Sequence, residues 1–380
     1  MADHSGGHLL VVDDNSVNRL VLGRYLQQQG HTVAYAENGR QAVDMLRAQP
    51  FEMMLLDIEM PEMNGYQVLE EMRSDARLRD MPIIVTSALD EMDSVVQCIQ
   101  MGAEDYLTKP IDQVLLKARI DASLEKKRLR DGQRDLLRKM EAELDFARNV
   151  QRSILPAQLP RTTGCDFGAV MIPARAVSGD FYEFIELDDN RVVVVVGDVS
   201  DKGVPAALFM ALTYSLINAE ARRALSPREA LANVNRYLLN MNEAGMFVTV
   251  LYGILNRVTR EFWYARAGHD QPIVLDADGQ PLEIERKAGQ ILGILPAPAL
   301  DEAHITLPAS STLLLFTDGA TEAMDAAGEL FGLRRVQAAF QLNRHASAQD
   351  ICIRVWQVIE EFSAHQPPHD DVTLVAIKLD

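Results

Sequence analysis

The first third of the chain alternates short apolar runs with amphipathic stretches, and this rhythm constrains the fold more than any other feature. The runs are HLLVV, HTVAYA, FEMMLL, MPIIVTS and DYLTK, and each is followed by a segment of helical character. Five consecutive strand–helix units predict an α/β domain with a doubly wound, five-stranded parallel sheet over residues 1–125. In such a sheet, functional side chains gather where the strands end.

Polar residues stand at the ends of these predicted strands. Asp13 and Asp14 end the first, Asp57 ends the third, Thr86 belongs to the fourth, and Lys109 ends the fifth. Three carboxylates in one crevice are the hard oxygen ligands that Mg²⁺ requires, and a carboxylate beside this ion can attack phosphorus. Lys109 can neutralise phosphoryl oxygens, and the Thr86 hydroxyl can donate a hydrogen bond to one. Each aspartate alone is more typical of a turn, but the set favours a phosphoryl-accepting site.

The motifs VVDD, LLDIEMPEMNGY, VTSA and DYLTKP resemble the receiver domain of two-component response regulators over about residues 8–125. That family uses a sensor histidine kinase as phosphodonor and one Mg²⁺ ion as cofactor. Phosphorylation is then a charge switch at the strand ends. The resemblance implies these roles: Asp57 as phosphoacceptor, Asp14 as direct metal ligand, Asp13 as ligand through water, the backbone carbonyl of Glu59 as ligand, Thr86 and Tyr106 as switch residues, and a cis peptide at Lys109-Pro110.

Residues 126–160 are charged and helix-favouring, which predicts a helical linker between two domains. An apolar seam repeats at alternating spacings of three and four, formed by Leu137, Met140, Leu144, Ala147, Gln151 and Ile154. This spacing favours a parallel coiled coil that makes a homodimer, with Gln151 as a polar core position. An amphipathic helix packed on its own domain is the alternative. The Leu155-Pro156 pair predicts the end of the helix.

Strand-like runs dominate residues 161–380. They are CDFGAVMI, DFYEFIEL, NRVVVVVGDV, FVTVLYGIL, EFWYARA, PIVLD and TLLLFTD. Helices are expected over residues 204–224, 227–243 and 347–364. Strands and helices that are segregated along the chain predict an α+β domain in which helices cover a β-sandwich.

Four acidic motifs in this segment each place an aspartate between an apolar run and a loop. They are VSGDFYEF with Asp180, VVGDVSDKGVPAAL with Asp198, LFTDGATEA with Asp318, and PPHDDVTL with Asp370 and Asp371. Carboxylates without histidine or cysteine companions favour Mg²⁺ or Mn²⁺ over Zn²⁺. Two such ions can lower the pKa of a water and clamp a phosphate for in-line attack. One of these aspartates alone would indicate a turn, so the interpretation depends on the set.

These motifs, together with ELDFARNVQRSILP, FVTVLYGIL and ARAGHDQP, resemble the metal-dependent protein phosphatases (PPM, phosphatase 2C-like) of the SpoIIE branch. The resemblance covers nearly all of residues 143–380 and implies an αββα sandwich. It also implies two Mn²⁺ or Mg²⁺ ions held by Asp180, Asp198, the backbone carbonyl of Val199, Asp318 and Asp370. Asp371 is then a neighbour of the centre rather than a main ligand.

Three polar residues near these motifs have open roles. Ser200 stands where some relatives carry a histidine general acid, so water or another residue must protonate the leaving group. Arg175 either binds the substrate phosphate or is an ordinary surface arginine. His269 of AGHDQP is expected to be a hydrogen-bonded structural histidine rather than an acid or base.

The two resemblances together predict a cytoplasmic response regulator whose output domain is a serine/threonine phosphatase. Phosphorylation of Asp57 would act on the phosphatase through the linker. The implied substrate is a phosphorylated anti-sigma-factor antagonist in a partner-switching pathway. The alternative is a phosphorylation-gated adaptor whose phosphatase-like domain binds a partner without catalysis.

Charge and composition exclude other classes. With 37 basic and 55 acidic residues the net charge is −18, which argues against binding nucleic acid or an anionic membrane. The longest apolar runs have the length of strands rather than membrane spans, and the N-terminal segment does not predict a signal peptide. Cys98, Cys165 and Cys352 lack metal-ligand spacing, which predicts reduced, packed thiols of a cytosolic protein.

Overall fold

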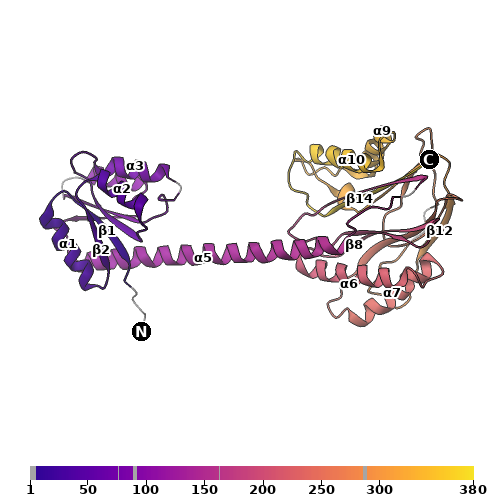
Figure 1. The fold of residues 1–380 in the computed structure, drawn as a ribbon, viewed down its shortest axis with the longest axis horizontal. Coiled ribbons are helices and arrows are strands. Elements are labelled where there is room, and N and C mark those ends of the chain that lie inside the picture. The colour runs from indigo at the N-terminus through magenta and orange to yellow at the C-terminus, as the bar shows by residue number, and fades with distance from the viewer. Residues whose placement is uncertain (1–5, 76, 89–91, 162, 286–288) are drawn as a thin grey trace. The chain divides into compact units, whose positions relative to one another are not determined.

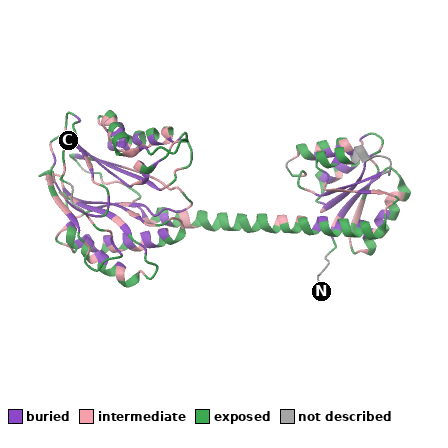
Figure 2. Ribbon diagram, turned by 180° about the vertical axis from the view of Figure 1, so that it is seen from behind, coloured by how far each residue is buried: buried purple, intermediate pink, exposed green. Residues whose placement is uncertain are grey.

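The computed structural model describes residues 1–380 except 1–5, 76, 89–91, 162 and 286–288, and it describes only the backbone of residues 88 and 92–95. The chain forms two compact units, Met1–Met140 and Glu141–Asp380. Each unit has its own hydrophobic core, as the buried strands in Figure 2 show.

The first unit is a parallel sheet covered by helices on both faces (Figure 1). The sheet order is β2-β1-β3-β4-β5, and every described pair is parallel. Apolar residues of α1 and α5 pack on one face, and those of α2, α3 and α4 pack on the other. The predicted doubly wound α/β fold is therefore confirmed. Its elements are β1 (His8–Val12), α1 (Ser16–Gln28), β2 (Thr32–Ala36), α2 (Gly39–Ala48), β3 (Met53–Asp57), α3 (Gly65–Ser74), β4 (Ile83–Ala88), α4 (Met92–Met101), β5 (Asp105–Lys109) and α5 (Gln113–Ile154).

Local sequence explains where these elements begin. The five residues of β3 are all buried because helices cover both faces of the sheet. The Asn15 side chain accepts hydrogen bonds from the amides of Val17 and Asn18, which caps α1 directly after the first aspartate pair. Asn64 and Gln67 form a reciprocal capping box at the start of α3.

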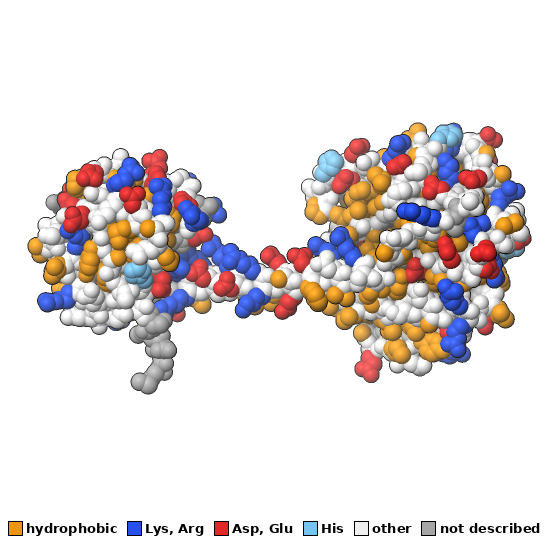
Figure 3. Space-filling model, in the orientation of Figure 1, with side chains coloured by type: hydrophobic (Ala, Val, Ile, Leu, Met, Phe, Trp, Pro, Cys, Tyr) orange, Lys and Arg blue, Asp and Glu red, His pale blue; other side chains and the backbone are white. Residues whose placement is uncertain are grey.

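Helix α5 is one continuous helix of 42 residues that ends at Ile154, as Leu155-Pro156 predicts. Lysine, arginine, aspartate and glutamate side chains follow one another along its exposed middle (Figure 3). Leu137 and Met140 are about half exposed, whereas Gln151 is buried and Ile154 packs on the core of the second unit. The prediction that Gln151 is a coiled-coil core position is therefore wrong, since its side chain packs within its own chain. Dimerisation through the exposed part of the seam stays a prediction.

The second unit has two antiparallel sheets, with orders β12-β10-β9-β8-β7 and β11-β13-β14-β6. Their facing sides enclose one core cluster. Helices α6 and α7 pack on the first sheet, and α9 and α10 pack on the second (Figure 1). The elements are β6 (Cys165–Ile172), β7 (Phe181–Glu186), β8 (Arg191–Val199), α6 (Val204–Glu220), α7 (Pro227–Met241), β9 (Val248–Asn256), β10 (Glu261–Ala267), β11 (Ile273–Leu275), β12 (Asp301–Thr306), β13 (Thr312–Phe316), α8 (Gly319–Glu322), α9 (Gly332–Asn343), α10 (Ala348–Phe362) and β14 (Val372–Leu379).

This arrangement confirms the predicted αββα sandwich. The sequence reading did not include β12, α8 and α9. Strand β12 lies at the edge of its sheet and has a polar sequence, so it lacks the apolar run by which the other strands were identified. Cys98, Cys165 and Cys352 are free and buried, and burial raises the pKa of the Cys98 thiol to about 11, which confirms packed thiols. None of the described helices combines the length and apolar character that crossing a membrane requires.

Candidate functional site

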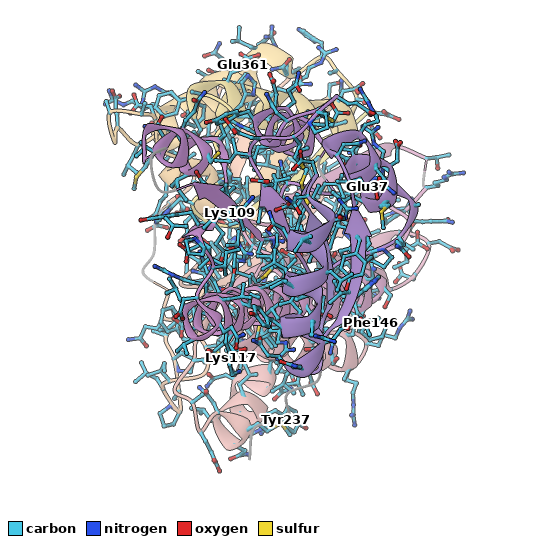
Figure 4. The ribbon with its side chains drawn as sticks, turned by 90° about the vertical axis from the view of Figure 1, so that its left-hand side faces the viewer. Glu37, Lys109, Lys117, Phe146, Tyr237 and Glu361 are labelled. Atoms are coloured by element: carbon cyan, nitrogen blue, oxygen red, sulfur yellow. The ribbon has the colours of Figure 1, made fainter. Side chains whose placement is uncertain are left out.

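The strand ends of the parallel sheet bring the predicted carboxylates together. Oxygen atoms of Asp13, Asp14 and Asp57 all lie within 4.8 Å of one another. Lys109, labelled in Figure 4 at the end of β5, donates from Nζ to Asp57 Oδ2 at 2.6 Å and to Asp13 Oδ2 at 3.0 Å. Thr86 is buried and is the cross-strand partner of Asp57. These residues form one compact crevice with the donors and acceptors of a phosphoryl-accepting site.

Opposing effects act on the Asp57 carboxyl. Burial is the largest, and it raises the pKa of Asp57 to about 6 even though Lys109 stabilises the charged form. The charge of the neighbouring Asp13 carboxylate is a smaller contribution in the same direction. A divalent cation between the carboxylates would favour their charged forms, and an ionised Asp57 is the form that can act as a nucleophile.

Two residues that the sequence reading did not select hold Asp13 in place. Asn18 donates from Nδ2 to both Asp13 carboxylate oxygens at 3.2 Å, and Arg19 donates to the Asp13 carbonyl at 2.7 Å. Both come from the first turn of α1, directly after the strand end. Of the other implied residues, Glu59 is exposed and Tyr106 is half-buried, and the Lys109-Pro110 peptide is cis.

Antiparallel pairing explains how the second unit gathers its aspartates. Asp180 precedes β7 and Asp198 lies near the end of β8, and these strands pair with Phe181 opposite Gly197. Asp318 follows β13 and Asp370 precedes β14, which pair with Phe316 opposite Leu374. In an antiparallel pair, the start of one strand lies beside the end of its neighbour. Each sheet therefore presents two aspartates at one end.

Asp180 is the most deeply buried of the four. Its Oδ2 atom accepts hydrogen bonds from the hydroxyls of Thr317 and Thr373, both at 2.7 Å. Its Oδ1 atom is buried without a hydrogen-bond partner. Burial, and then the carboxylates of Asp198 and Asp371, raise the pKa of Asp180 well above its ordinary value. A buried carboxylate oxygen without a partner is the kind of atom that a bound cation satisfies.

The Asp198 carboxyl interacts with those of Asp180, Asp318 and Asp370. Burial raises its pKa to about 8, and the charges of Asp318 and Asp370 raise it as well. Asp318 has a pKa of about 6, raised by burial first and then by Glu322 and Asp370. These mutual repulsions show that the carboxylates are close enough to compete for protons or to share cations.

The donor set fits hard divalent cations. It contains carboxylates without histidine or cysteine, as Mg²⁺ or Mn²⁺ requires. Within the described part of the chain, no three of these aspartates come within 4.8 Å of one another as the receiver carboxylates do. The second set is therefore more widely spaced than the receiver carboxylates.

The neighbouring Asp371 has a different position. Its Oδ1 accepts from the Ala174 amide at 2.7 Å, and its Oδ2 accepts from the Ser178 hydroxyl at 2.8 Å and the Gly179 amide at 2.7 Å. These bonds tie the loop before Asp180 to the start of β14. Gly319 must lack a side chain here, because a Cβ would lie 2.0 Å from the Asp371 carbonyl oxygen.

Lys202, which the sequence reading did not select, contacts the centre. Its Nζ lies 3.0 Å from Asp370 Oδ2 and donates to the His369 carbonyl at 2.7 Å. Lys202 and Arg175 line the same cavity of about 420 Å³, and the Arg175 guanidinium comes close to Gly203. Lys202 therefore lies at the edge of the aspartate set, and Arg175 is exposed at the same cavity. The sequence could have indicated Lys202, because it belongs to the motif GDVSDKG and stands four residues after Asp198.

The histidine and serine near the motifs have structural contacts. The His269 ring is buried, its Nδ1 pairs with the Thr249 hydroxyl at 2.9 Å, and burial lowers its pKa to about 3. A neutral, buried imidazole fits the expected structural histidine. The Ser200 hydroxyl accepts from the Phe247 amide at 2.9 Å, which links β8 to the start of β9.

Clustered carboxylates predict a pH dependence of the metal-free protein. The pKa of Asp198 is about 8 in the folded state and about 4 in an unfolded chain. The folded state therefore binds more protons between these values, so stability is highest below about pH 4 for this group and is lost as the pH rises through 8. We expect the EDTA-treated protein to lose thermal stability from pH 6 to pH 8.5.

The control for this pH effect is Asp198→Asn, which keeps the shape and removes the titrating group. Its melting temperature should fall less over the same pH range, and added Mn²⁺ should flatten the wild-type profile. Identical pH profiles for wild type and Asp198→Asn in EDTA would contradict the prediction.

The crevice of carboxylates at the strand ends of a parallel sheet is typical of a receiver domain. The four aspartates on an αββα sandwich are typical of a phosphatase 2C-like domain. The family model described as Stage II sporulation protein E (SpoIIE) matches residues 188–380, and the response regulator receiver domain model matches residues 9–121. The chain therefore belongs to the SpoIIE family and carries an N-terminal receiver domain.

Individual proteins resemble each part. The phosphoserine phosphatase RsbU of Bacillus subtilis is 29% identical over 246 residues, which cover 64% of this chain and 72% of that protein. The two-component response regulator ORR5 of Oryza sativa is 34% identical over 105 residues, which cover 27% of this chain and 78% of that protein. The SiaA-PP2C domain of Pseudomonas aeruginosa has a TM-score of 0.58 at 23% identity and covers 64% of this chain and 99% of that chain, which shows a shared fold.

Proposed function

We propose that this chain is a response regulator whose phosphorylation on Asp57 controls a metal-dependent phosphoserine/phosphothreonine protein phosphatase in its second unit. The observation that carries the proposal is the four-aspartate centre, in which the Asp198 carboxyl interacts with the other three and Asp180 Oδ1 is buried without a hydrogen-bond partner. Family membership and the likeness to RsbU support this proposal.

The phosphatase centre would hold two Mn²⁺ or Mg²⁺ ions through a small set of ligands: Asp180, Asp198, the Val199 carbonyl, Asp318 and Asp370. When bound, these ions would supply Lewis-acid stabilisation of the phosphoryl oxygens during in-line hydrolysis. The protein contributes fixed carboxylate positions, since Thr317 and Thr373 orient Asp180. Leaving-group protonation falls to water or a residue other than Ser200, whose hydroxyl is bonded to the Phe247 amide.

Arg175 would bind the substrate phosphate beside this centre. Arg175 is exposed and lines the same cavity as Lys202, whose ammonium pairs with Asp370. We expect Arg175→Ala to raise KM about tenfold for both p-nitrophenyl phosphate and a phosphoprotein, because a charge-assisted hydrogen bond to phosphate is lost. The catalytic constant kcat should change less than KM.

Arg152→Ala is the matched control for Arg175→Ala, because Arg152 is an exposed arginine on α5. It should leave KM unchanged. An unchanged KM for Arg175→Ala would assign this residue to the ordinary protein surface.

In the receiver, Asp57 would attack the phosphorus atom of a phosphohistidine on a sensor histidine kinase. The new oxygen–phosphorus bond forms as the bond from phosphorus to the histidine nitrogen breaks, and the kinase histidine leaves. Asp13, Asp14, Asp57 and the carbonyl of Glu59 would hold one Mg²⁺ ion there. Lys109 pairs with Asp57 at 2.6 Å, and it would neutralise the phosphoryl oxygens.

Thr86 and Tyr106 would carry the change outward from the phosphorylated site. Thr86 lies beside Asp57 across the β3–β4 pair, and Tyr106 lies opposite Val85 across the β4–β5 pair. A phosphoryl group on Asp57 adds acceptor oxygens within reach of this strand. We further propose that the exposed part of the α5 seam joins two copies of the chain as a homodimer.

The proposed substrate is a phosphorylated anti-sigma-factor antagonist or a similar phosphoprotein. The test is release of phosphate from such proteins and from p-nitrophenyl phosphate, measured with Mn²⁺, with Mg²⁺ and with EDTA. Hydrolysis that requires the cation supports the phosphatase. Binding of a phosphoprotein with no cation-dependent turnover would favour the phosphorylation-gated adaptor.

A further inference from the structure

The last turns of α5 pack against the second unit, and the Gln151 side chain is buried there with 7% of its surface exposed. Its amide pairs with the backbone of Ser178 in both directions. Nε2 donates to the Ser178 carbonyl at 2.7 Å, and the Ser178 amide donates to Oε1 at 2.9 Å. Because two bonds join one side chain to one residue, they fix both the position and the orientation of Ser178 relative to the helix.

Ser178 in turn holds the start of the aspartate centre. Its hydroxyl donates to Asp371 Oδ2 at 2.8 Å and accepts from the Asp180 amide at 3.0 Å. Ser178 and Asp180 are almost fully buried. Ser178 therefore connects Gln151 of the helix to the Asp180 backbone. The hydrogen bonds of this connection are buried, so solvent does not screen them.

The position of this loop decides where the carboxylate of Asp180 can point. Thr317 and Thr373 already bind its Oδ2 atom, so a shift of the backbone rotates the buried, unpartnered Oδ1 atom about that fixed end. A second contact couples the same loop to the helix, since Arg148 donates from Nε to the Ala176 carbonyl at 2.7 Å. Two side chains of α5 that lie about one turn apart, Arg148 and Gln151, therefore form hydrogen bonds with the backbone of this loop.

We propose that Gln151 is a positioning residue through which α5 sets the affinity of the Asp180 site for a divalent cation. This inference rests on the proposed function, which makes Asp180 a metal ligand. It also identifies the contact through which the linker helix would act on the aspartate centre. Any movement of α5 relative to the second unit must first break the hydrogen bonds between Gln151 and Ser178. The exposed seam residues Leu137, Met140 and Leu144 lie on the turns immediately before it.

The test compares Gln151→Leu with Asn149→Leu in the full-length chain. Asn149 is an exposed amide on the same helix, so its replacement controls for losing an amide from α5. Both variants are made in an Asp14→Asn background, which removes the receiver's metal site from the measurement. Mn²⁺ binding is followed by titration calorimetry, and folding by circular dichroism. We expect the apparent dissociation constant to rise about 10- to 100-fold for Gln151→Leu, as for other residues that orient metal ligands, and to stay unchanged for Asn149→Leu.

A double-mutant cycle separates positioning from general destabilisation. Ser178→Ala keeps the backbone pair with Gln151 but removes the hydroxyl from Asp371 and the Asp180 amide. If both residues act along one path, the losses of Mn²⁺ affinity in Gln151→Leu and Ser178→Ala will not add in the double variant. Gln151→Glu keeps the acceptor oxygen and loses the donor, so an intermediate affinity is expected, and this variant carries the test should Gln151→Leu fail to fold.

Two results would overturn the inference, and they differ in scope. Wild-type Mn²⁺ affinity in folded Gln151→Leu or Gln151→Glu, or fully additive losses in the cycle, would reject the positioning role and leave the proposed phosphatase intact. Absence of Mn²⁺ binding by the Asp14→Asn parent itself would reject the metal centre, and the inference with it.

Discussion

Replacing Asp198 by alanine should lower Mn²⁺-dependent hydrolysis of a phosphoprotein by about 10³-fold. Asp198 is one of the proposed metal ligands, and its carboxyl interacts with those of Asp180, Asp318 and Asp370. Lewis-acid stabilisation of the transition state contributes several kcal/mol, and each 1.4 kcal/mol is about a factor of ten in rate. Initial rates with p-nitrophenyl phosphate and with phosphoprotein, over a range of Mn²⁺ concentrations, measure the effect.

The variant should fold, because alanine removes a carboxylate whose charge is unfavourable in the metal-free protein. Its melting temperature in EDTA at pH 8 should therefore equal or exceed that of the wild type. Asp189→Asn is the matched control, since Asp189 is exposed in the turn before β8 and should leave the rate unchanged. A rate for Asp198→Ala within tenfold of wild type would contradict its role as a metal ligand.

Replacing Asp57 by asparagine should abolish phosphorylation of the receiver and the response of the phosphatase to it. Asparagine keeps the shape of the side chain and can still accept from Lys109, but its amide cannot form an acyl phosphate. With acetyl phosphate and Mg²⁺, the wild type should gain one phosphoryl group, seen as a mass increase or a shifted band on a phosphate-affinity gel. Asp57→Asn should show none.

The regulatory consequence is measured in the same samples. The wild-type phosphatase rate and molar mass in solution should change on addition of acetyl phosphate, whereas Asp57→Asn should keep constant values. Asp44→Asn, an exposed aspartate on α2, is the control and should respond as the wild type does. If acetyl phosphate altered the rate of Asp57→Asn as much as that of the wild type, control through this aspartate would be wrong.

Much of the fold could be predicted because its signals are local. Five apolar runs with helices between them specify a parallel sheet, since such connections have few alternatives. The buried strands of the second unit were equally clear. The polar edge strand β12 was missed because edge strands carry little apolar pattern. The helix α9 was missed because Phe331, the residue before it, makes no side-chain cap.

The candidate sites show the same division. Asp13, Asp57, Asp180 and Asp198 stand at strand ends that pattern reading can locate. The residues that orient them come from other elements: Asn18 from α1 binds Asp13, and Thr317 and Thr373 from the second sheet bind Asp180. Thr317 and Thr373 belong to motifs that the sequence analysis selected. A threonine beside an aspartate in sequence, however, does not indicate which carboxylate its hydroxyl will bind.

The sequence by itself determined which residues carry charge and where each strand ends, because hydrophobic periodicity and strand-terminal aspartates are local properties. The tertiary structure alone decided how the helical linker is used. The apolar spacing of three and four along this helix had assigned Gln151 to a seam between two chains. That assignment was wrong because periodicity indicates which face of a helix is apolar but not what covers that face. Folding places Gln151 against Ser178, within two residues of a buried carboxylate, because that backbone segment needs partners for its buried polar groups.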